Sequence, residues 1–151
     1  MRPRRLQSSA ADGSVPSRRL QVPNDMAALE PARLAALDFV VGHGLSDRLV
    51  FQLELVLEET LMNRLWHAFP DGGRHVTEVT LQLLPDTLVL QFDDDGVPFD
   101  PRQAAEPAPA ASLEDARPGG LGLMLTRKAA RTLDYERVAG RNRLTVQLAR
   151  R

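Results

Sequence analysis

The sequence predicts a two-layer α+β domain in which helices cover one face of a mostly antiparallel sheet. A long apolar stretch with helical spacing, residues 49–69, supplies the main helix. Two pairs of alternating stretches, 75–84 with 87–93 and 133–138 with 143–149, read as strands joined by short turns. Short turns connect antiparallel strands, and helices with one apolar face share the covered side of such a sheet.

Length and composition limit the functional classes. The chain has 151 residues, a net charge of -1, no cysteine and three histidines. One domain of this length buries a core without disulfides, and cysteine chemistry is excluded. The near-neutral charge gives no attraction to nucleic acid or anionic lipid, and the histidines lack zinc-ligand spacing. No apolar run approaches the ~20 residues of a membrane span, so a cytoplasmic protein is expected.

The N-terminal part divides into a tail and the start of the domain. Residues 1–17 are rich in arginine, serine, glycine and proline, and we predict a disordered tail. The domain then extends over 18–151. A short edge strand is expected at 18–22, followed by an amphipathic helix at 24–41, whose regular part begins near Glu30 because Pro31 suits a first turn.

The central helix carries polar residues at a fixed spacing. Glu59, Asn63 and His67 are four residues apart, so they lie on one helical face. Apolar residues are expected to bury most of the remaining surface: Phe51, Val56, Leu57, Leu61, Met62, Leu65 and Phe69. A buried carboxylate and amide need partners. Either they satisfy each other in the core, or they face a ligand cavity.

Two further segments have residue types suited to a binding site. Asp94 and Gly96 close a strand within Asp-Asp-Asp-Gly, which is either turn chemistry or an acceptor for an amino group. Residues 101–118 are rich in alanine and proline and read as a long loop. Gly119, Gly120, Leu121 and Gly122 then lead into a helix at 123–132, whose N-terminus offers free N–H groups to a phosphate.

Taken in order, these segments resemble a known family. LEETLMNRLWHAFPDGG, FDDDGVPFDP, PGGLGLMLTRKAA and YERVAGRNRLTV are similar to the conserved boxes of the Bergerat-type (gyrase, Hsp90, histidine kinase and MutL) ATPases. Within that class the chain most resembles the bacterial anti-sigma factor serine/threonine kinases. The resemblance implies the Bergerat ATP-binding fold, with a mostly antiparallel mixed sheet, and spans nearly the whole domain.

The resemblance also implies a role for each residue. Glu59 would be the general base, and Asn63 would hold Mg²⁺ against the triphosphate of ATP. Adenine would be bound by Asp94, Gly96 and, from the last strand, Thr145. Residues 101–118 would be the ATP lid. The remaining candidate nucleotide contacts are His67, Arg117, Gly119, Gly120, Leu121, Gly122 and Leu123.

Three functional hypotheses follow. The first is an anti-sigma-type serine/threonine kinase that uses ATP and Mg²⁺, phosphorylates a STAS-domain antagonist, sequesters a sigma factor and forms a homodimer. The second is a non-catalytic ATP-dependent binding switch. The third is a structural interaction module. Glu59 favours the kinase because a passive binder needs no base, and neither direct nucleic-acid nor membrane binding is expected.

Overall fold

The computed structural model describes residues 15–103 and 120–151. Its elements, in chain order, are β1 (Ser17–Pro23), the 3-10 helix η1 (Met26–Ala28), α2 (Leu29–Val40), α3 (Asp47–His67), β2 (Val76–Leu83), β3 (Thr87–Asp94), α4 (Gly120–Ala129), β4 (Thr132–Val138) and β5 (Arg141–Ala149). The expected strands and helices are therefore present.

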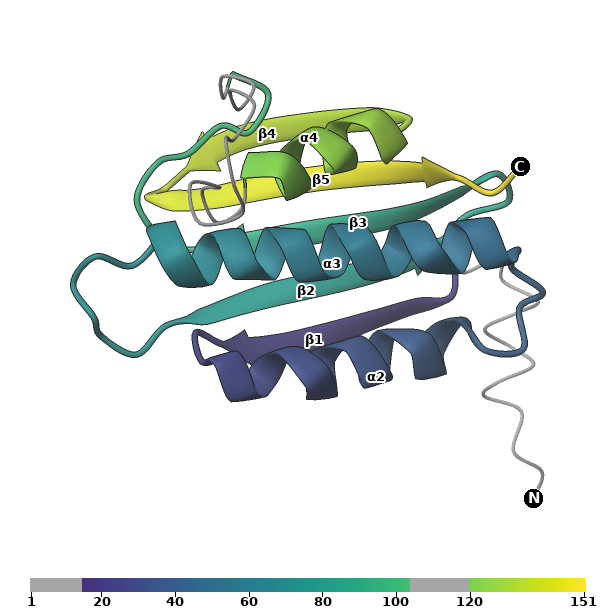
Figure 1. Ribbon diagram of the computed structural model, residues 1–151, viewed down its shortest axis with the longest axis horizontal. Coiled ribbons are helices and arrows are strands. Elements are labelled where there is room, and N and C mark those ends of the chain that lie inside the picture. The colour runs from purple at the N-terminus through teal and green to yellow at the C-terminus, as the bar shows by residue number, and fades with distance from the viewer. Residues whose placement is uncertain (1–14, 104–119) are drawn as a thin grey trace, which may run out of the picture.

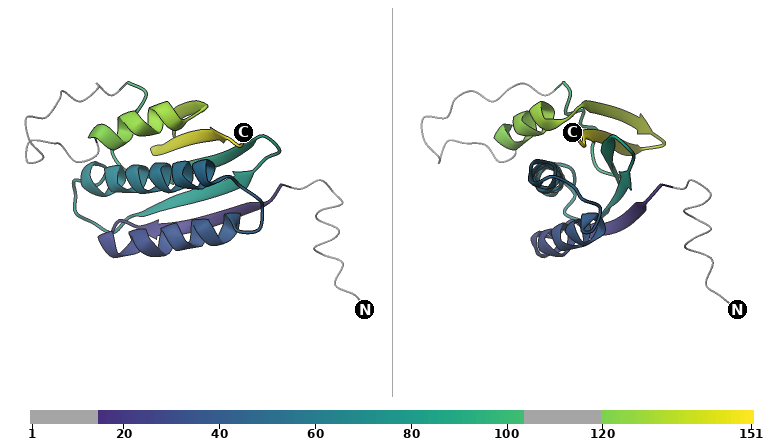
Figure 2. Two further views of the ribbon diagram at one scale, coloured as in Figure 1. Left: turned by 45° about the vertical axis from the view of Figure 1, so that its right-hand side comes forward. Right: turned by 90° about the vertical axis from the view of Figure 1, so that its right-hand side faces the viewer.

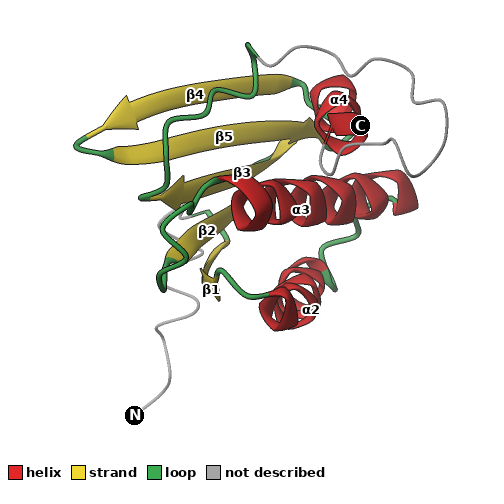
Figure 3. Ribbon diagram, turned by 60° about the vertical axis from the view of Figure 1, so that its left-hand side comes forward, coloured by secondary structure: helices red, strands yellow, loops and turns green. Residues whose placement is uncertain are grey.

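The strands form one five-stranded sheet in the order β1-β2-β3-β5-β4 (Figure 1). Each pairing between the described strands is antiparallel. The helices α2, α3 and α4 lie on the same face of this sheet (Figures 2 and 3). The predicted α+β class with a one-sided helical layer is confirmed, and β1 is an edge strand as expected.

The core lies between α3 and the central strands. Leu53, Val56 and Leu57 of α3 are fully or almost fully buried against Leu90 of β3 and Val146 of β5. Burial of each large aliphatic side chain contributes about 1.5–3 kcal/mol. Two residues further along β3, Phe92 lies beside Leu144 of β5, which in turn lies beside Tyr135 of β4. The core therefore extends directly into the row that borders the candidate site.

The central helix is positioned by its cap and its inward stripe. The Ser46 hydroxyl accepts a hydrogen bond from the Leu49 N–H at 3.1 Å, so the helix begins at Asp47, two residues before the predicted start. The expectation that Phe51 is buried is wrong, because 68% of this residue is exposed. The apolar residues outnumber the inward positions of one helical face, and Phe51 lies on the outer face.

Other boundaries shift by a few residues. The regular helix α2 begins at Leu29, one residue before the predicted Glu30, and the first residues of the predicted 24–41 segment form the separate helix η1, capped by the Asp25 carboxylate. The C-terminal hairpin turns at Ala139 and Gly140, both with positive φ (53° and 76°), so β5 begins at Arg141, before the predicted residue 143. A turn of this kind matches the right-handed twist of two antiparallel strands.

Part of the predicted organisation lies outside the described residues. This applies to residues 1–14 of the predicted tail and 104–118 of the predicted lid. Ser17, assigned to the tail, is the first residue of β1. The described helices include none that is both long and apolar enough to cross a membrane.

Candidate active site

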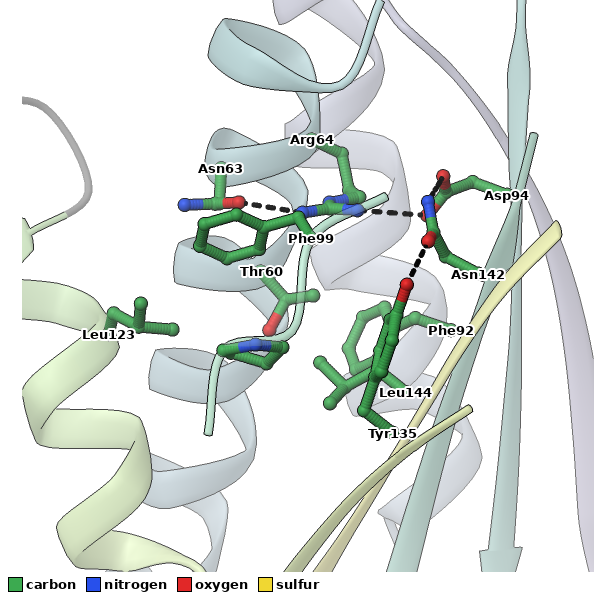
Figure 4. Close-up of a pocket in the computed structure, with 11 residues that line it drawn as sticks. Thr60, Asn63, Arg64, Phe92, Asp94, Phe99, Leu123, Tyr135, Asn142 and Leu144 are labelled. Atoms are coloured by element: carbon green, nitrogen blue, oxygen red, sulfur yellow. Dashed lines mark hydrogen bonds and ion pairs between the residues drawn. The ribbon is translucent and has the colours of Figure 1, made fainter. Parts of the chain in front are cut away.

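A pocket opens between the C-terminal half of α3, the ends of β3 and β5, and α4 (Figure 4). It contains side chains from segments far apart in the sequence. Its lining is Thr60, Asn63, Arg64, Phe92, Asp94, Phe99, Pro101, Leu123, Tyr135, Asn142 and Leu144. The structure thus brings together Asn63, Asp94 and Leu123, which the sequence predicted to share a hollow over the sheet.

Asp94 is the buried acid of this pocket. Its relative exposure is 1%, and it ends β3 opposite Asn142 of β5. Its Oδ1 accepts hydrogen bonds from the Gly96 N–H at 2.8 Å and from Asn142 Nδ2 at 2.9 Å. Its Oδ2 faces an Arg64 Nη1 at 3.3 Å. A buried carboxylate needs such partners, and the arrangement fixes its direction toward the pocket.

Asn63 and Arg64 are neighbours on α3 and contact each other. Asn63 is 7% exposed, and its Oδ1 accepts a hydrogen bond from Arg64 Nη2 at 2.8 Å. Arg64 therefore joins the amide and the Asp94 carboxylate through one guanidinium (Figure 4). Sequence reasoning missed this residue. The available signal was an arginine inside a helix read as largely buried, since a buried cation requires an anionic partner.

Asn142 and its neighbours form a second group that sequence reasoning missed. Asn142 is 2% exposed, and its Nδ2 also lies within hydrogen-bond range of the carbonyls of Gly96 (3.2 Å) and Val97 (2.9 Å). Its Oδ1 accepts from the Tyr135 hydroxyl and, at 2.9 Å, from Arg137. These bonds hold the Asp94–Val97 turn against the C-terminal hairpin. The sequence indicated only a turn here.

Glu59 lies against the start of α4. A β-carbon at Gly122 would be 1.7 Å from Oε2 of Glu59, so any side chain at this position would force the Glu59 carboxylate to move. Burial raises the pKa of the Glu59 carboxyl, and the neighbouring Glu58 charge raises it further. The predicted base is thus beside the glycine segment that opens a helix, one turn before Asn63.

Gly96 has a packing role at the end of α3. A β-carbon there would lie 2.7 Å from both the side chain and the carbonyl of Ala68. The Val97 N–H donates to that Ala68 carbonyl at 2.9 Å. Gly96 is absent from the described pocket lining. The requirement for glycine therefore comes from the close approach of the turn after β3 to the C-terminal end of α3, and contact with an adenine ring remains a prediction.

Two predicted contacts do not reach the pocket. Thr145 pairs with Gln91 across the sheet, and its hydroxyl accepts from Gln91 Nε2 at 3.3 Å. Its neighbour Leu144 lines the pocket, and successive strand residues alternate faces, so Thr145 points to the other side of the sheet. His67, a candidate nucleotide contact, is exposed at the end of α3 and does not border the pocket.

Other predicted residues are only partly described. Gly120 and Leu121 are the first residues of α4, so this helix begins earlier than the predicted residue 123. The earlier start places the helix N-terminus within the glycine segment. Arg117 and Gly119 lie outside the described residues. Their predicted contacts with phosphate remain predictions.

A charged cluster surrounds His75 and includes Asp95, the residue after Asp94. His75 is bonded through Nδ1 to Asp95 at 2.9 Å and through Nε2 to Asp71 at 3.0 Å. Its ring stacks on Phe69, with 4.4 Å between centroids. These carboxylates, Asp95 first, raise the pKa of His75. The cluster ties the loop after α3 to the residue that follows Asp94.

The donor set fits a cation held mainly by substrate oxygens and water. Among residues 15–103 and 120–151, no three acidic or histidine side chains gather as a metal site. The Asn63 amide oxygen is one suitable ligand, and Mg²⁺ characteristically takes few protein ligands beside phosphate and water. The free space in the pocket is about 20 Å³, close to the room for one water molecule. A purine therefore requires the pocket to open.

Comparisons with known proteins agree with this geometry. The family model described as "Histidine kinase-like ATPase domain" matches residues 22–148. The serine/threonine-protein kinase BtrW of Bordetella bronchiseptica is 42% identical over 101 residues, which are 67% of this chain and 71% of that protein.

Solved structures show the same fold. The RsbU and RsbW domains of Rv1364c from Mycobacterium tuberculosis match with a TM-score of 0.62 and 13% identity, over 90% of this chain and 33% of that chain. The histidine kinase domain of Erythrobacter litoralis EL346 matches with a TM-score of 0.50 and 16% identity, over 82% and 60%. The chain thus spans a third of the mycobacterial chain and three fifths of the second.

Proposed function

Because the chain belongs to the histidine kinase-like ATPase domain family, we propose that it binds ATP with Mg²⁺ and phosphorylates a serine on a STAS-domain anti-sigma antagonist. It is a serine/threonine protein kinase of the anti-sigma factor type. The 42% identity to a protein named serine/threonine-protein kinase supports the reaction class. The nature of the protein substrate rests on the resemblance to that kinase class.

One observation carries the proposal. Asn63, Asp94 and Leu123 line one pocket, while Glu59 touches Gly122 at the adjoining start of α4. Asp94 is suited to accept a hydrogen bond from adenine, and Asn63 offers an oxygen to a cation. The start of α4 and the Glu59 carboxylate lie next to them. Phosphoryl transfer depends on positioning and charge stabilisation by such groups.

The residues would divide the work as follows. Asp94 Oδ2 accepts a hydrogen bond from the adenine amino group, because Oδ1 already accepts two. Asn63 Oδ1 would hold the cation, and the N–H groups at the start of α4 would donate to the phosphates. When bound, Mg²⁺ neutralises charge on the triphosphate. These contacts orient the terminal phosphate toward Glu59.

Glu59 would accept the proton in the transfer step. The substrate serine oxygen forms a bond to the γ-phosphorus as the bond from that phosphorus to the β–γ bridging oxygen breaks. ADP leaves with the electron pair, and the serine proton moves to the Glu59 carboxylate. The raised pKa of Glu59 makes it a stronger base than an exposed glutamate.

The test measures binding and transfer separately. Wild type, Asn63→Ala and Glu59→Ala are titrated with ATP in the presence and absence of Mg²⁺, then incubated with candidate STAS-domain proteins and labelled ATP. Asn63→Ala should lose Mg²⁺-dependent binding, whereas Glu59→Ala should bind but not transfer. Equal binding by all three proteins would exclude the assigned site. Binding by wild type without transfer would identify the ATP-dependent switch instead.

Partner capture is a further part of the proposal. Sequestration of a sigma factor and homodimer formation both rest on the resemblance to anti-sigma factor kinases. Sedimentation equilibrium of the chain alone, and pull-down of sigma factors with and without ATP, address these two points. A monomer at all concentrations would remove the dimer from the proposal.

A further inference from the structure

We propose that Arg64 is a gate inside the nucleotide site, where its guanidinium occupies the two oxygen atoms that ATP and Mg²⁺ use. The side chain has to leave these atoms before the nucleotide binds. The inference rests on the proposed function, because it uses the same site and explains how that site is kept closed. Nothing in the assigned phosphoryl transfer requires an arginine at this position of α3.

The first contact blocks the cation ligand. Arg64 Nη2 donates to Asn63 Oδ1 at 2.8 Å. A magnesium ion would sit about 2.0–2.1 Å from the same oxygen. A guanidinium held against this oxygen would then lie within a few ångströms of the divalent charge, in a site largely shielded from water. Two positive groups repel strongly at that separation, so they cannot share the oxygen.

The second contact blocks the base acceptor. Asp94 Oδ1 already accepts from Gly96 and Asn142. Oδ2 is therefore the carboxylate oxygen left for an amino group, and Arg64 Nη1 lies 3.3 Å from it. One side chain thus holds both atoms to which the proposed function assigns a ligand.

Space and packing agree with a closed state. The pocket has about 20 Å³ of free volume. The Arg64 guanidinium carbon lies 5.3 Å from the centre of the Phe99 ring, a cation–π distance. Phe99 and Pro101 line the pocket on the side from which the chain continues toward residue 104. The Arg64 side chain therefore fills part of the cavity and packs against Phe99, which forms one of its walls.

The direct test compares nucleotide affinity with and without the gate. ADP and the non-hydrolysable analogue AMP-PNP, each with Mg²⁺, are titrated calorimetrically into wild type and Arg64→Leu. If the competent, open state is a minor one in wild type, removing the gate should tighten binding about tenfold. Arg19→Leu, a substitution on the exposed edge strand β1, is the matched control and should bind as wild type. Equal or weaker binding by Arg64→Leu overturns the gate.

A second measurement needs no mutation. Removing Arg64 leaves the Asp94 carboxylate without its cation, so Arg64→Leu can fail to fold. Arginine side-chain NMR of the wild type follows the Arg64 N–H groups directly. They should be protected from solvent exchange in the nucleotide-free protein and should shift and lose protection when AMP-PNP and Mg²⁺ bind. Unchanged Arg64 signals in the nucleotide complex would show that the side chain stays in place, and would refute the proposal.

The outcomes separate this inference from the proposed function. Wild-type binding with no gain in Arg64→Leu overturns the gate alone. Binding by Arg64→Leu but not by wild type supports the gate in its strongest form. No binding by either folded protein overturns both the ATP site and the gate.

Discussion

Glu59 and Gly122 are in contact where α3 meets α4. Oε2 of Glu59 occupies the place that a β-carbon on residue 122 would take, 1.7 Å away. Glycine at residue 122 therefore allows the carboxylate to keep this position. This relationship couples the predicted base to the helix start that is predicted to bind phosphate, so a change at either residue should affect the other.

Gly122→Ala should displace Glu59 and strongly reduce phosphoryl transfer. Overpacking of a buried contact costs about 1–3 kcal/mol, which thermal unfolding measures. Gly42→Ala is a useful control, because Gly42 has a positive φ of 87° but no atom within 4 Å of the added carbon. It should lose some stability and keep full transfer per folded molecule. Full activity in Gly122→Ala would show that Glu59 can move without consequence.

Glu59→Gln should retain nucleotide binding and lose transfer by about 10²–10⁴-fold, the usual contribution of a general base. The wild-type rate should rise with pH as the Glu59 carboxyl deprotonates, with an inflection above its ordinary value of 4.5 because its pKa is raised. The measurement is single-turnover transfer against pH. Persistence of this inflection in Glu59→Gln would assign it to another group.

His75 should make stability depend on pH. Its pKa is raised above 6.5 in the folded state by hydrogen bonds to Asp95 and Asp71. Stabilisation by the protonated ring is fully present below 6.5 and is lost as pH rises through the higher folded-state pKa. The melting temperature should therefore fall over that interval.

The matched variants for this pH effect are His75→Gln and His67→Gln. His75→Gln should abolish the decline in melting temperature. His67→Gln, which changes an exposed histidine outside the cluster, should preserve it. An unchanged pH profile in His75→Gln would rule out the cluster as its cause.

Asn142→Ala should destabilise the protein by about 3 kcal/mol or more. The substitution leaves the buried Gly96 carbonyl and the partly buried Val97 carbonyl without this donor, and it removes one bond to Asp94. Nucleotide affinity should fall as well, because the Asp94 carboxylate loses a bond that fixes its direction. Gln147→Ala, at an outward-facing position of the same strand, is the control for chemical denaturation. Equal stability of the two variants would contradict the role assigned to Asn142.

Local pattern was sufficient for much of the fold. The alternation of Val79, Leu81 and Leu83 and the helical spacing of Leu57 and Leu61 predict the strand and helix that the structure shows. Such patterns indicate which side of an element faces the core, so they can be recognised in the sequence without knowledge of the tertiary structure. They failed for Phe51, because an apolar residue on a helix does not by itself show which face is covered.

The site was predictable in outline for a related reason. Asn63 and Glu59 lie on one helical face by spacing alone, and Asp94 follows a strand that the pattern identifies. The predicted place of Thr145 at the pocket differs from the structure. A shift of one residue along a strand moves a side chain to the opposite face of the sheet, and hydrophobicity did not distinguish Thr145 from its neighbours. Arg64 and Asn142 were missed because their partners are distant in sequence, at separations of 30 and 48 residues.

The sequence by itself determined the α+β class, the order of the elements and the family resemblance, since these depend on residue type and local spacing. Only the tertiary structure decided that Arg64 lies between Asn63 and Asp94, and that Glu59 occupies the space beside Gly122. Those contacts depend on how the sheet and helices pack, because hydrogen bonds and steric contacts between segments act over only a few ångströms. They produce no periodic pattern in the sequence from which they could be predicted.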